Sequence, residues 1–409
     1  MQNTQHITND LIYVGASDRR LALFENVYPV PRGVSYNSYV LLDEKAVLFD
    51  TVDASVAQQF YENVEAALAG RKLDYVVVHH MEPDHAATLM DLLLRHPEAT
   101  VVTTAKAAQM MEQFFGTKPA QLMAVKEGDT LCTGAHTLVF TMAPMVHWPE
   151  VMMTYDSTAK TLFSADAFGT FGALSGNLFA DQMDFEHEWL SDARRYYINI
   201  VGKYGLQVQN VLKKAATLDI KMICPLHGPV WRSKEQVAGQ AVTSSLGWFI
   251  GKHDVWSRYE PEDKGVVIIY GSIYGHTEAA ALRLGTLLSE RGVRGIKAYD
   301  ASHTHASKLV AECFRASHVV LASSTYNNGL FTPIESLLAD LKAHAWQKRT
   351  VALIENGSWA AQTAKLMRAE LEQMKDIAIV GDPASLKSAA TPAQEQQLAA
   401  LADQIVSSL

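Results

Sequence analysis

Two imidazoles and two carboxylates fall within six positions of the segment His79-His80-Met81-Glu82-Pro83-Asp84-His85. The segment directly follows the apolar run 75–78, which is typical of a buried strand. Pro83 disfavours helical geometry at the residue before it, so we expect a loop at the strand end rather than a helix face. Burying these polar groups is costly unless a metal ion organises them. The segment therefore predicts a metal site, in preference to a solvated acidic turn.

Length and composition limit the classes of protein to which the chain can belong. Its 409 residues are enough for two domains, and contents of 48% hydrophobic and 19% charged residues are typical of a globular protein. No run approaches the roughly 18 apolar residues of a membrane span, and the N-terminus lacks signal-peptide features, so we expect a cytoplasmic protein without a membrane partner. A formal net charge of −9 argues against a nucleic-acid partner.

The cysteines give no sign of metal or redox chemistry. Cys132, Cys224 and Cys313 lie far apart, so no C-x-x-C pair exists for zinc or for disulfide exchange. We therefore expect all three to be buried, small apolar residues in a reducing compartment.

The first half of the chain, from about residue 13 to residue 231, is rich in predicted strands with helices between them. One long amphipathic helix is expected over 191–218, opening with a Ser/Asp cap. Two paired strands, 36–42 and 46–50, are expected around the turn 43–45. The other expected strands are 137–140 and 161–164, and the other expected helices are 86–95 and 105–115. This mixture predicts a layered α/β sandwich.

The pattern changes after the polar, proline-containing stretch 256–264, which we interpret as the domain boundary. Beyond it, strands and helices alternate. The expected strands are 266–270, 319–323, 350–355 and 377–380, and the expected helices are 278–291, 334–345, 361–374 and 392–409. Alternating strands and helices from residue 265 onward predict a doubly wound parallel sheet.

Three more candidate metal ligands follow predicted strands of the first half: His147, Asp166 and His227. Each alone would be unremarkable, but together with His80, Glu82, Asp84 and His85 they supply four imidazoles, three carboxylates and no thiolate. This balance suits iron or manganese better than structural zinc. Asp166 is the natural bridge, since a carboxylate can span two cations that a histidine can bind only singly. Two metals bridged in this way form a reactive centre.

The second half contains a candidate phosphate-binding turn. Residues 271–277 are rich in hydroxyls and lie between a predicted parallel strand and the start of a helix. Neither G-x-x-x-x-G-K nor G-x-G-x-x-G is present, which argues against a nucleoside triphosphatase and weakens a dinucleotide-binding interpretation. Taken alone, the turn could also be an ordinary capped connection.

Two further loops, 323–329 and 355–359, end neighbouring strands of the same predicted sheet, where ligands of such sheets bind. Tyr326 and Trp359 offer aromatic surface for a flat ring, and the Asn/Gly backbones offer hydrogen bonds at its edge. The candidate cofactor-binding residues are Ser272, Ile273, Tyr274, Gly275, His276, Thr277, Thr325, Tyr326, Asn327, Asn328, Gly329, Asn356, Gly357, Ser358 and Trp359.

The order His-x-Glu-x-Asp-His, followed by His147, Asp166 and His227, resembles the metallo-β-lactamase fold. Zinc hydrolases of that fold usually carry a histidine where this chain has Glu82. With that departure, and with three loops that resemble the flavodoxin pattern for FMN, the whole chain is similar to the flavodiiron proteins (A-type flavoproteins) of the two-domain class.

The resemblance implies a ligand set for two irons. One iron would take His80, Glu82 and His147, and the other Asp84, His85 and His227, with Asp166 bridging. The family tolerates displacement of His85 from the metal. His79 has no role in the family, and we interpret it as incidental.

The resemblance also implies an architecture and an activity. We expect a metallo-β-lactamase-like αβ/βα sandwich with the diiron site over residues 1–256, and a flavodoxin-like FMN-binding domain over 265–409. The protein would be an oxidoreductase that reduces oxygen to water, nitric oxide to nitrous oxide, or both, at a non-haem diiron site fed by FMN. The ligand set does not separate the two gases.

The resemblance further implies an external electron donor and an assembly. The expected donor is rubredoxin, with a reduced deazaflavin cofactor as the alternative, and the expected assembly is a head-to-tail homodimer or a dimer of dimers. Two other hypotheses stay open: a zinc-dependent hydrolase fused to an electron-transfer flavodoxin module, and a non-catalytic redox sensor.

Overall fold

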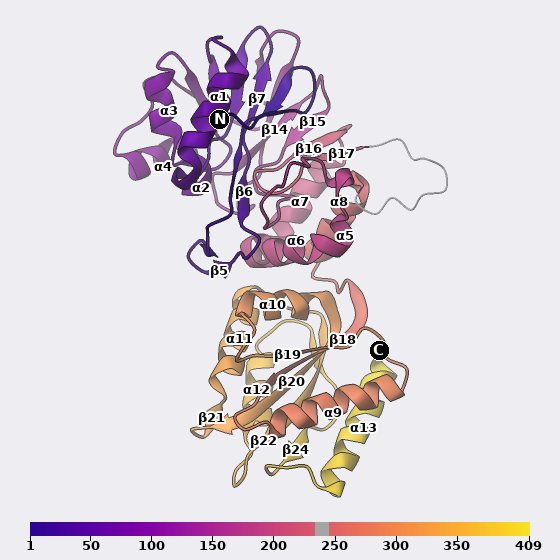
Figure 1. Ribbon diagram of the computed structural model, residues 1–409. Helices are drawn as coiled ribbons and strands as arrows, with labels where there is room; N and C mark the ends of the chain where they lie inside the picture. The colour runs from indigo at the N-terminus through magenta and orange to yellow at the C-terminus, as the bar shows by residue number, and fades with distance from the viewer. Residues whose placement is uncertain (234–244) are drawn as a thin grey trace. The chain divides into compact units, whose positions relative to one another are not determined.

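The computed structural model describes residues 1–233 and 245–409, which form two compact units (Figure 1). The first unit comprises Met1–Tyr197 and Leu206–Asp254, and the second comprises Ile198–Gly205 and Val255–Leu409. Residues 234–244, inside the predicted first domain, lie outside the described part of the chain. The division into a diiron domain over residues 1–256 and an FMN-binding domain over residues 265–409 stays a prediction. Among the described helices, none has both the length and the apolar character needed to cross a bilayer.

The first unit is built on two mixed sheets. The first sheet has the order β1 (Gln5–His6), β2 (Leu11–Tyr13), β7 (Tyr39–Leu42), β8 (Ala46–Phe49), β9 (Tyr75–Val77), β10 (Thr100–Thr104) and β11 (Leu122–Val125). The second runs through β12 (Thr130–Cys132), β13 (Thr137–Met142), β14 (Met152–Asp156), β15 (Thr161–Phe163), β16 (Met222–Cys224) and β17 (Trp231–Arg232). Two separate pairs of short antiparallel strands complete the first unit: β3 (Ala16–Asp18) with β6 (Val34–Tyr36), and β4 (Leu23–Phe24) with β5 (Tyr28–Pro29).

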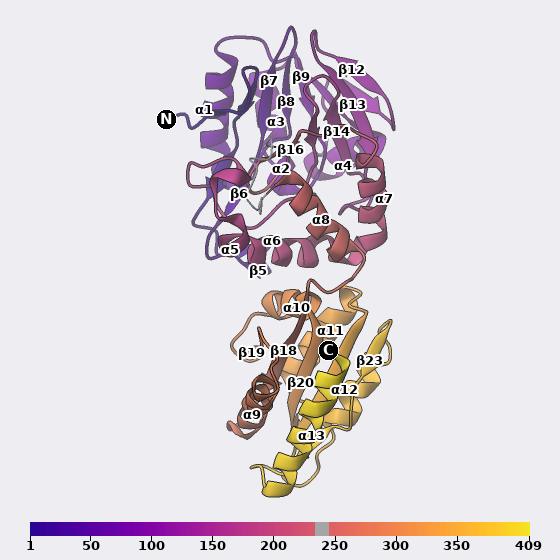
Figure 2. The ribbon, with the colours of Figure 1, turned by 90° about the vertical axis from the view of Figure 1, so that its right-hand side faces the viewer.

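A shared apolar core joins these two sheets. Phe49 of the first sheet and Phe163 of the second are stacked, with ring centroids 3.7 Å apart, and both are buried. The helices of this part of the chain are α1 (Ala57–Leu68), α2 (Pro83–Ala86), α3 (Leu89–Arg95), α4 (Ala105–Phe115), α5 (Phe185–Glu188), α6 (Leu190–Tyr196), α7 (Gly205–Ala215) and α8 (Leu246–Ser257). Figure 2 shows α1 outside the first sheet and α7 outside the second. The layers therefore follow the predicted sandwich arrangement.

Three predicted elements of this half are wrong in detail. The helix expected over 86–95 is divided, since α2 ends at Ala86 and α3 begins at Leu89. The strand expected over 36–42 is divided, because Asn37 leaves the sheet: its side-chain amide donates to the carbonyl oxygens of Pro225 and Gly228, each at 2.8 Å. The single helix expected over 191–218 is also broken. It passes through a π-helical turn (Tyr197–Val201) and a 3₁₀ turn (Gly202–Tyr204) between α6 and α7.

The break in this helix is explained by the side chain of Tyr259, a residue outside the helix. The Tyr259 hydroxyl donates to the carbonyl of Lys203 at 3.0 Å and accepts from the backbone N–H of Gly205 at 3.2 Å. A side chain inserted in this way interrupts the regular hydrogen-bond ladder of a helix. The expected Ser/Asp cap is wrong as well, because α6 begins at Leu190 without a side-chain cap.

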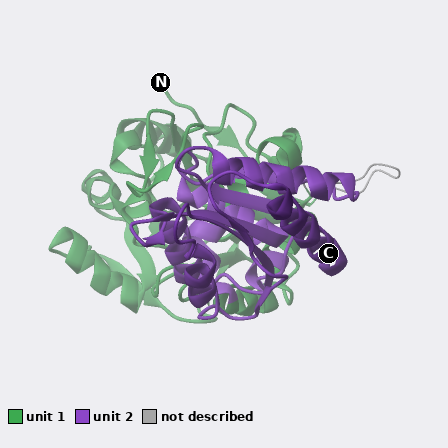
Figure 3. Ribbon diagram, turned by 90° about the horizontal axis from the view of Figure 1, so that it is seen from below, with its two compact units in different colours: residues 1–197, 206–254 green, residues 198–205, 255–409 purple. Residues whose placement is uncertain are grey.

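The second unit, purple in Figure 3, is a parallel sheet covered by helices. Its strands have the order β19 (Lys297–Asp300), β18 (Asp263–Gly271), β20 (Ala316–Tyr326), β22 (Arg349–Asn356) and β23 (Ile377–Ile379); β24 (Ala384–Leu386) also pairs with β22, and β21 (Gly329–Leu330) with β20. The helices are α9 (His276–Glu290), α10 (Ala306–Arg315), α11 (Thr332–Ala343), α12 (Thr363–Leu371) and α13 (Pro392–Ser408). This strand order is the flavodoxin-like one.

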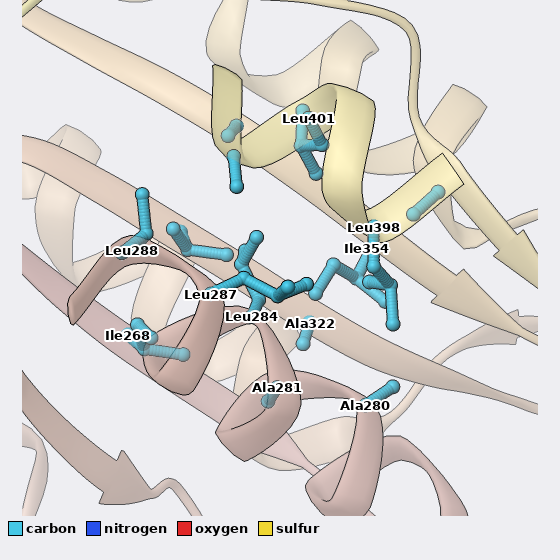
Figure 4. Packing of buried hydrophobic residues seen from close by; sticks show 14 of the residues in the cluster. Ile268, Ala280, Ala281, Leu284, Leu287, Leu288, Ala322, Ile354, Leu398 and Leu401 are labelled. Carbon is cyan, nitrogen blue, oxygen red and sulfur yellow. The ribbon is translucent and has the colours of Figure 1, made fainter. Parts of the chain in front are cut away.

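The core of the second unit lies between this sheet and the helices α9 and α13 (Figure 4). Leu284 of α9 and Leu398 of α13 are fully buried against Ile354 of β22. All predicted elements of this half are present, but β19, β21, β24 and α10 were not predicted. The connection between the two halves is also shorter than the predicted 256–264, since α8 ends at Ser257 and β18 begins at Asp263.

The prediction that the cysteines are buried is correct for Cys224 and Cys313 and wrong for Cys132. Cys132 is exposed at the end of the short strand β12.

Candidate metal centre and flavin cavity

The seven predicted metal ligands come together in the first unit as two groups. The first group is His80, Glu82, His147 and Asp166, and the second is Asp84, His85 and His227. They reach the same edge of the sandwich because they follow the ends of β9, β13, β15 and β16.

The loop predicted over residues 79–85 ends at Glu82. Pro83 begins the short helix α2, and Glu82 is its N-terminal cap residue, so Asp84 and His85 belong to a helix and not to a loop. The expectation was wrong there because proline disfavours a helix before it but suits the first helical position, where no backbone N–H is needed.

The first group has the geometry of donors around one ion. The Oε2 atom of Glu82 is 3.2 Å from His80 Nε2 and 3.1 Å from His147 Nε2. The same two nitrogens are 3.3 and 3.2 Å from Oδ2 of Asp166. Ligand atoms bonded at about 2.1 Å to one cation stand about 3 Å apart, so these four side chains can share an ion.

The second group repeats the arrangement on the other side of Asp166. Oδ2 of Asp84 is 3.2 Å from the Nε2 atoms of both His85 and His227. These nitrogens are 3.1 and 3.5 Å from Oδ1 of Asp166. The two oxygens of one carboxylate thus face different histidine pairs, which is the arrangement that a bridging ligand requires.

Unpartnered buried atoms show that the residues fit metal ions. In the described part of the chain, both carboxylate oxygens of Asp84, Oδ1 of Asp166, and the Nε2 atoms of His85 and His227 have no hydrogen-bond partner. Each such buried group costs about 1–3 kcal/mol when left unsatisfied. Coordination to two cations would satisfy all of them. The donor set, imidazole and carboxylate without thiolate, suits iron.

The charges of the cluster also favour cations. Burial works to raise the pKa of Asp166, but the neighbouring histidines His85, His147 and His80 outweigh it and hold that pKa well below its usual range. Burial works to lower the pKa of His85 and of His147, but the surrounding carboxylates raise both to about 9. The site therefore favours positive charge, which metal ions supply when they displace protons.

Residues behind the ligands fix the histidine tautomers, and the sequence did not reveal them. His80 donates from Nδ1 to Oε1 of Glu150 at 2.7 Å, and His227 donates from Nδ1 to the carbonyl of Ser35 at 2.7 Å. Each bond leaves Nε2 free for a metal. By contrast, Nδ1 of the buried His85 has no hydrogen-bond partner among the described residues.

His79 is not incidental, although it has no role in the family pattern. It is buried, its Nδ1 and backbone N–H both donate to the carboxylate of Asp50, and its Nε2 pairs with Oγ1 of Thr154 at 2.7 Å. Asp50 follows β8 in the first sheet, and Thr154 lies on β14 in the second. His79 therefore joins the two sheets next to the first metal ligand.

Two more side chains approach the cluster. The Tyr196 ring is edge-on to His227, with centroids 5.4 Å apart, and its buried hydroxyl has no hydrogen-bond partner in the described chain. Burial, and then the negative charge of Asp166, raises the pKa of Tyr196 far above its usual value. Glu25, an exposed residue in the turn between β4 and β5, lies near Glu82. Partial desolvation of its carboxyl and the negative charge of Glu82 raise the pKa of Glu25 to about 8.

The second unit contains a cavity of about 770 Å³ at the carboxyl ends of its strands. Its lining comprises Ser272, Ile273, Tyr274, His276, Thr277, Ser324, Thr325, Tyr326, Asn327, Asn328, Asn356, Gly357, Ser358, Trp359, Ala360 and Ser388. Of the predicted cofactor-binding residues, only Gly275 and Gly329 are absent from this lining. Ser324, Ala360 and Ser388 were not predicted.

The cavity has the size and chemistry of a flavin site. Its volume lies in the range of ligand pockets, and its lining contains no Lys, Arg, Asp or Glu side chain in the described chain. Tyr274 and Trp359 are 91% and 92% exposed. Aromatic side chains are usually more buried than this, and exposed rings beside a cavity offer a stacking surface for a flat ligand. Gly275 opens α9 with φ +90°, and its N–H donates to Ser272 Oγ at 3.0 Å, which shapes the phosphate turn.

The chain combines a sandwich that carries two linked groups of metal donors with a flavodoxin-like sheet that has an aromatic-lined cavity. This combination defines a class of redox flavoprotein with a binuclear metal centre. Comparison with known proteins agrees. Residues 34–228 match the family described as ODP family beta lactamase. The chain is 30% identical over 374 residues to the anaerobic nitric oxide reductase flavorubredoxin of Vibrio vulnificus, covering 90% of this chain and 73% of the relative.

Further relatives extend the match to the whole chain. The rubredoxin-oxygen oxidoreductase of Megalodesulfovibrio gigas is 29% identical over 411 residues, covering 100% of this chain and 98% of the relative. The solved structure of rubredoxin oxygen:oxidoreductase from Desulfovibrio gigas superposes with a TM-score of 0.90 at 28% identity, over 99% of this chain and 98% of that one. The flavodiiron protein from Giardia intestinalis gives a TM-score of 0.89 at 26% identity, over 100% and 98%.

The chain belongs to the flavodiiron protein family. The predicted fold, a metallo-β-lactamase-like sandwich followed by a flavodoxin-like sheet, is confirmed. Membership makes the protein an oxidoreductase and brings the cofactors of the family, FMN and two non-haem irons. The comparisons support this assignment over a zinc hydrolase fused to a flavodoxin.

Proposed function

We propose that this protein reduces oxygen to water, nitric oxide to nitrous oxide, or both, at a diiron centre in its first unit. The observation that carries the proposal is the position of Asp166, whose two oxygens face the two groups of histidine and carboxylate donors at 3.1–3.5 Å. When bound, two ferrous ions and a reduced flavin supply the four electrons that full reduction of oxygen requires. The names of the relatives, an oxygen oxidoreductase and a nitric oxide reductase, support both substrates.

The residues of this chain have distinct tasks in the proposal. His80, Glu82 and His147 would hold one iron and Asp84, His85 and His227 the other, and Asp166 would be shared between the two groups. Glu150 and Ser35 orient the histidines behind them. Because six of the seven ligands are buried and Glu82 is nearly so, the site keeps bulk water away while admitting a small gas.

In the second unit, the proposal assigns the cavity to FMN. The turn 272–277 would hold the phosphate with backbone N–H groups and hydroxyls, since no cationic side chain of the described residues lines the cavity. Tyr326 and Trp359 would contact the isoalloxazine ring. The electron donor would be a rubredoxin, as the names of two relatives suggest for those proteins, with a reduced deazaflavin as the alternative. The location in the cytoplasm stays a prediction of the sequence.

Metal and flavin analysis with gas assays tests the proposal. Protein expressed with adequate iron should contain about two irons and one FMN per chain, and it should consume oxygen or nitric oxide when a reduced donor is supplied anaerobically. Stoichiometric zinc after iron-replete expression, together with turnover of an ester or lactam, would overturn it. Bound cofactors without turnover of either gas would instead favour a sensor.

The proposal includes a head-to-tail homodimer, alone or as half of a dimer of dimers, in which each flavin serves the irons of the partner. The argument is one of symmetry: two-fold dimers are the commonest soluble oligomers and can place two different sites face to face. A mixing experiment tests it. Subunits carrying His80→Ala and His147→Ala are combined with subunits that cannot bind FMN. Activity should return in the mixed dimers, and mixtures that stay inactive while both parents fold would show electron transfer within one chain.

A further inference from the structure

The flavin cavity has a contribution from a strand that the sequence analysis did not identify. β24 (Ala384–Leu386) runs parallel to β22 with Leu386 paired to Asn356, and the chain leaving it places Ser388 in the cavity lining. Four parallel strands, β18, β20, β22 and β24, therefore deliver lining residues to one cavity. Ligands of doubly wound sheets bind at such carboxyl-terminal strand edges.

The side chain of Asn356 is engaged by this fourth segment. Its Oδ1 accepts from the backbone N–H of Ser388 at 2.9 Å, and its Nδ2 donates to the carbonyl of the same residue at 3.0 Å. Asn356 is also buried, with 6% of its surface exposed. Its amide thus continues the pairing of β22 with β24 beyond the last residue of the strand, and both of its polar atoms have protein partners.

The segment is held in a conformation that it would not adopt without such contacts. The backbone of Ser388 has φ +65°, which lies in the left-handed region that residues other than glycine and asparagine rarely adopt. Besides the Asn356 amide, the Ser358 hydroxyl contacts the Ser388 hydroxyl at 2.7 Å, and the Gly357 N–H donates to the Leu386 carbonyl at 3.2 Å. Strained residues that are fixed by several contacts tend to mark binding sites.

We propose that residues 386–389 form a fourth flavin-binding loop, and that Asn356 is a positioning residue that acts through this loop rather than on the flavin directly. The inference rests on the proposed flavin site and adds to it. The loop contributes at the ring end of the cavity. In the order β18, β20, β22, β24 it lies three strands from the phosphate turn, which is about 14 Å at about 4.8 Å per strand.

This placement makes a prediction that separates ring contacts from phosphate contacts. Apoprotein of the full chain is titrated with FMN and with riboflavin, which has the ring but no phosphate, by quenching of flavin fluorescence. Asn356→Ala should raise the Kd of both ligands about tenfold, the scale of a lost hydrogen-bonded contact. Ser272→Ala, at the phosphate turn, should raise the Kd of FMN and leave that of riboflavin unchanged.

Two further variants test whether Asn356 acts through the loop. Ser388→Ala should weaken both ligands, and the double variant with Asn356→Ala should be no weaker than Asn356→Ala alone. Ser385→Ala is the matched control: its hydroxyl donates to Glu355 Oε1 at 2.9 Å, which also ties β24 to β22, but neither residue lines the cavity. The control should keep the wild-type Kd for both ligands.

Three outcomes would overturn the inference: unchanged Kd values in Asn356→Ala, a loss confined to FMN, or effects of the two single variants that multiply. Circular dichroism checks folding. If Asn356→Ala does not fold, Asn356→Asp takes its place, since it keeps the acceptor for the Ser388 N–H and loses only the donor. Wild-type apoprotein that binds neither ligand would instead contradict the proposed function, so the two failures are distinguishable.

Discussion

Glu150 accepts a hydrogen bond from Nδ1 of His80 at 2.7 Å, and the same Oε1 atom accepts from the backbone N–H of Met81 at 2.9 Å. Glu150 is fully enclosed, with 2% of its surface exposed. One carboxylate oxygen therefore fixes both the tautomer of a metal ligand and the backbone that follows it, so that Nε2 of His80 points toward Glu82 and Asp166.

Replacing Glu150 should weaken the metal centre without removing a ligand. Glu150→Gln retains a hydrogen-bonding oxygen but loses the negative charge that raises the basicity of His80, and we expect iron affinity to fall about 10- to 100-fold. Competition with a chelator measures it. Glu127→Gln, which removes the negative charge of an exposed ion pair with Lys214, is the control and should bind iron like the wild type. Equal affinity in all three proteins would contradict the role given to Glu150.

Asp166→Asn should disable the binuclear centre while leaving flavin reduction nearly intact. An amide cannot bridge two cations as a carboxylate does, so we expect fewer than two irons per chain and loss of gas reduction. Iron analysis and the rate of flavin reduction by the donor are the measurements. Asp156→Asn, at a buried aspartate outside the cluster, is the comparison and should keep both irons. If Asp166→Asn keeps two irons and full turnover, the bridging assignment is wrong.

Asp50→Ala should destabilise the first unit strongly. The substitution leaves the Nδ1 and backbone N–H groups of the buried His79 without an acceptor, and loss of one member of a buried pair costs about 3–5 kcal/mol. Urea unfolding of the variant and the wild type measures the difference. Asp53→Ala removes only a cap that accepts from Ser55 at 2.7 Å and should cost about 0.5–2 kcal/mol. Similar losses in both variants would show that the pair contributes little.

A carboxylate-flanked histidine, His136, should make stability depend on pH. It bonds Asp156 at 2.6 Å and Asp10 at 3.0 Å; burial works to lower its pKa, but these carboxylates raise it above the ordinary 6.5. A raised pKa in the folded state means that the stabilisation is fully present below about pH 6.5 and is lost as pH rises through the folded value.

The measurement compares the wild type with His136→Gln at several pH values. Because solvent partly screens the pair, we expect the wild type to be more stable by about 1 kcal/mol near pH 5.5, with the difference shrinking by about pH 9. His303→Gln, which removes an exposed partner of Asp300, should show no such trend. A difference that grows with pH would reverse the predicted sign.

Much of the second unit could be predicted from the sequence because its elements carry local signals. Short stretches of sequence show the apolar runs of the strands β18, β20 and β22. They also show the apolar residues at helical spacing in α9, α11 and α13. β19 and β24 were missed because they are short: β19 (Lys297–Asp300) is an edge strand with no buried residue, and β24 (Ala384–Leu386) follows a Gly-Asp-Pro turn. Such strands are defined by their neighbours and not by their own pattern.

The chemistry of this protein could be inferred from its amino-acid sequence without coordinates. The residue types of the seven metal ligands, their places after strands and the three loops of the second half are properties of local sequence, and they sufficed for the fold class and the family. The family resemblance already implied that the ligands divide into two groups around Asp166. The residues that support those ligands became visible only in the folded structure. Glu150, Asp50 and Ser388 are separated in sequence from His80, His79 and Asn356, their partners, by 70, 29 and 32 positions. Contacts between distant segments arise from packing of the whole sheet, and no local pattern encodes them.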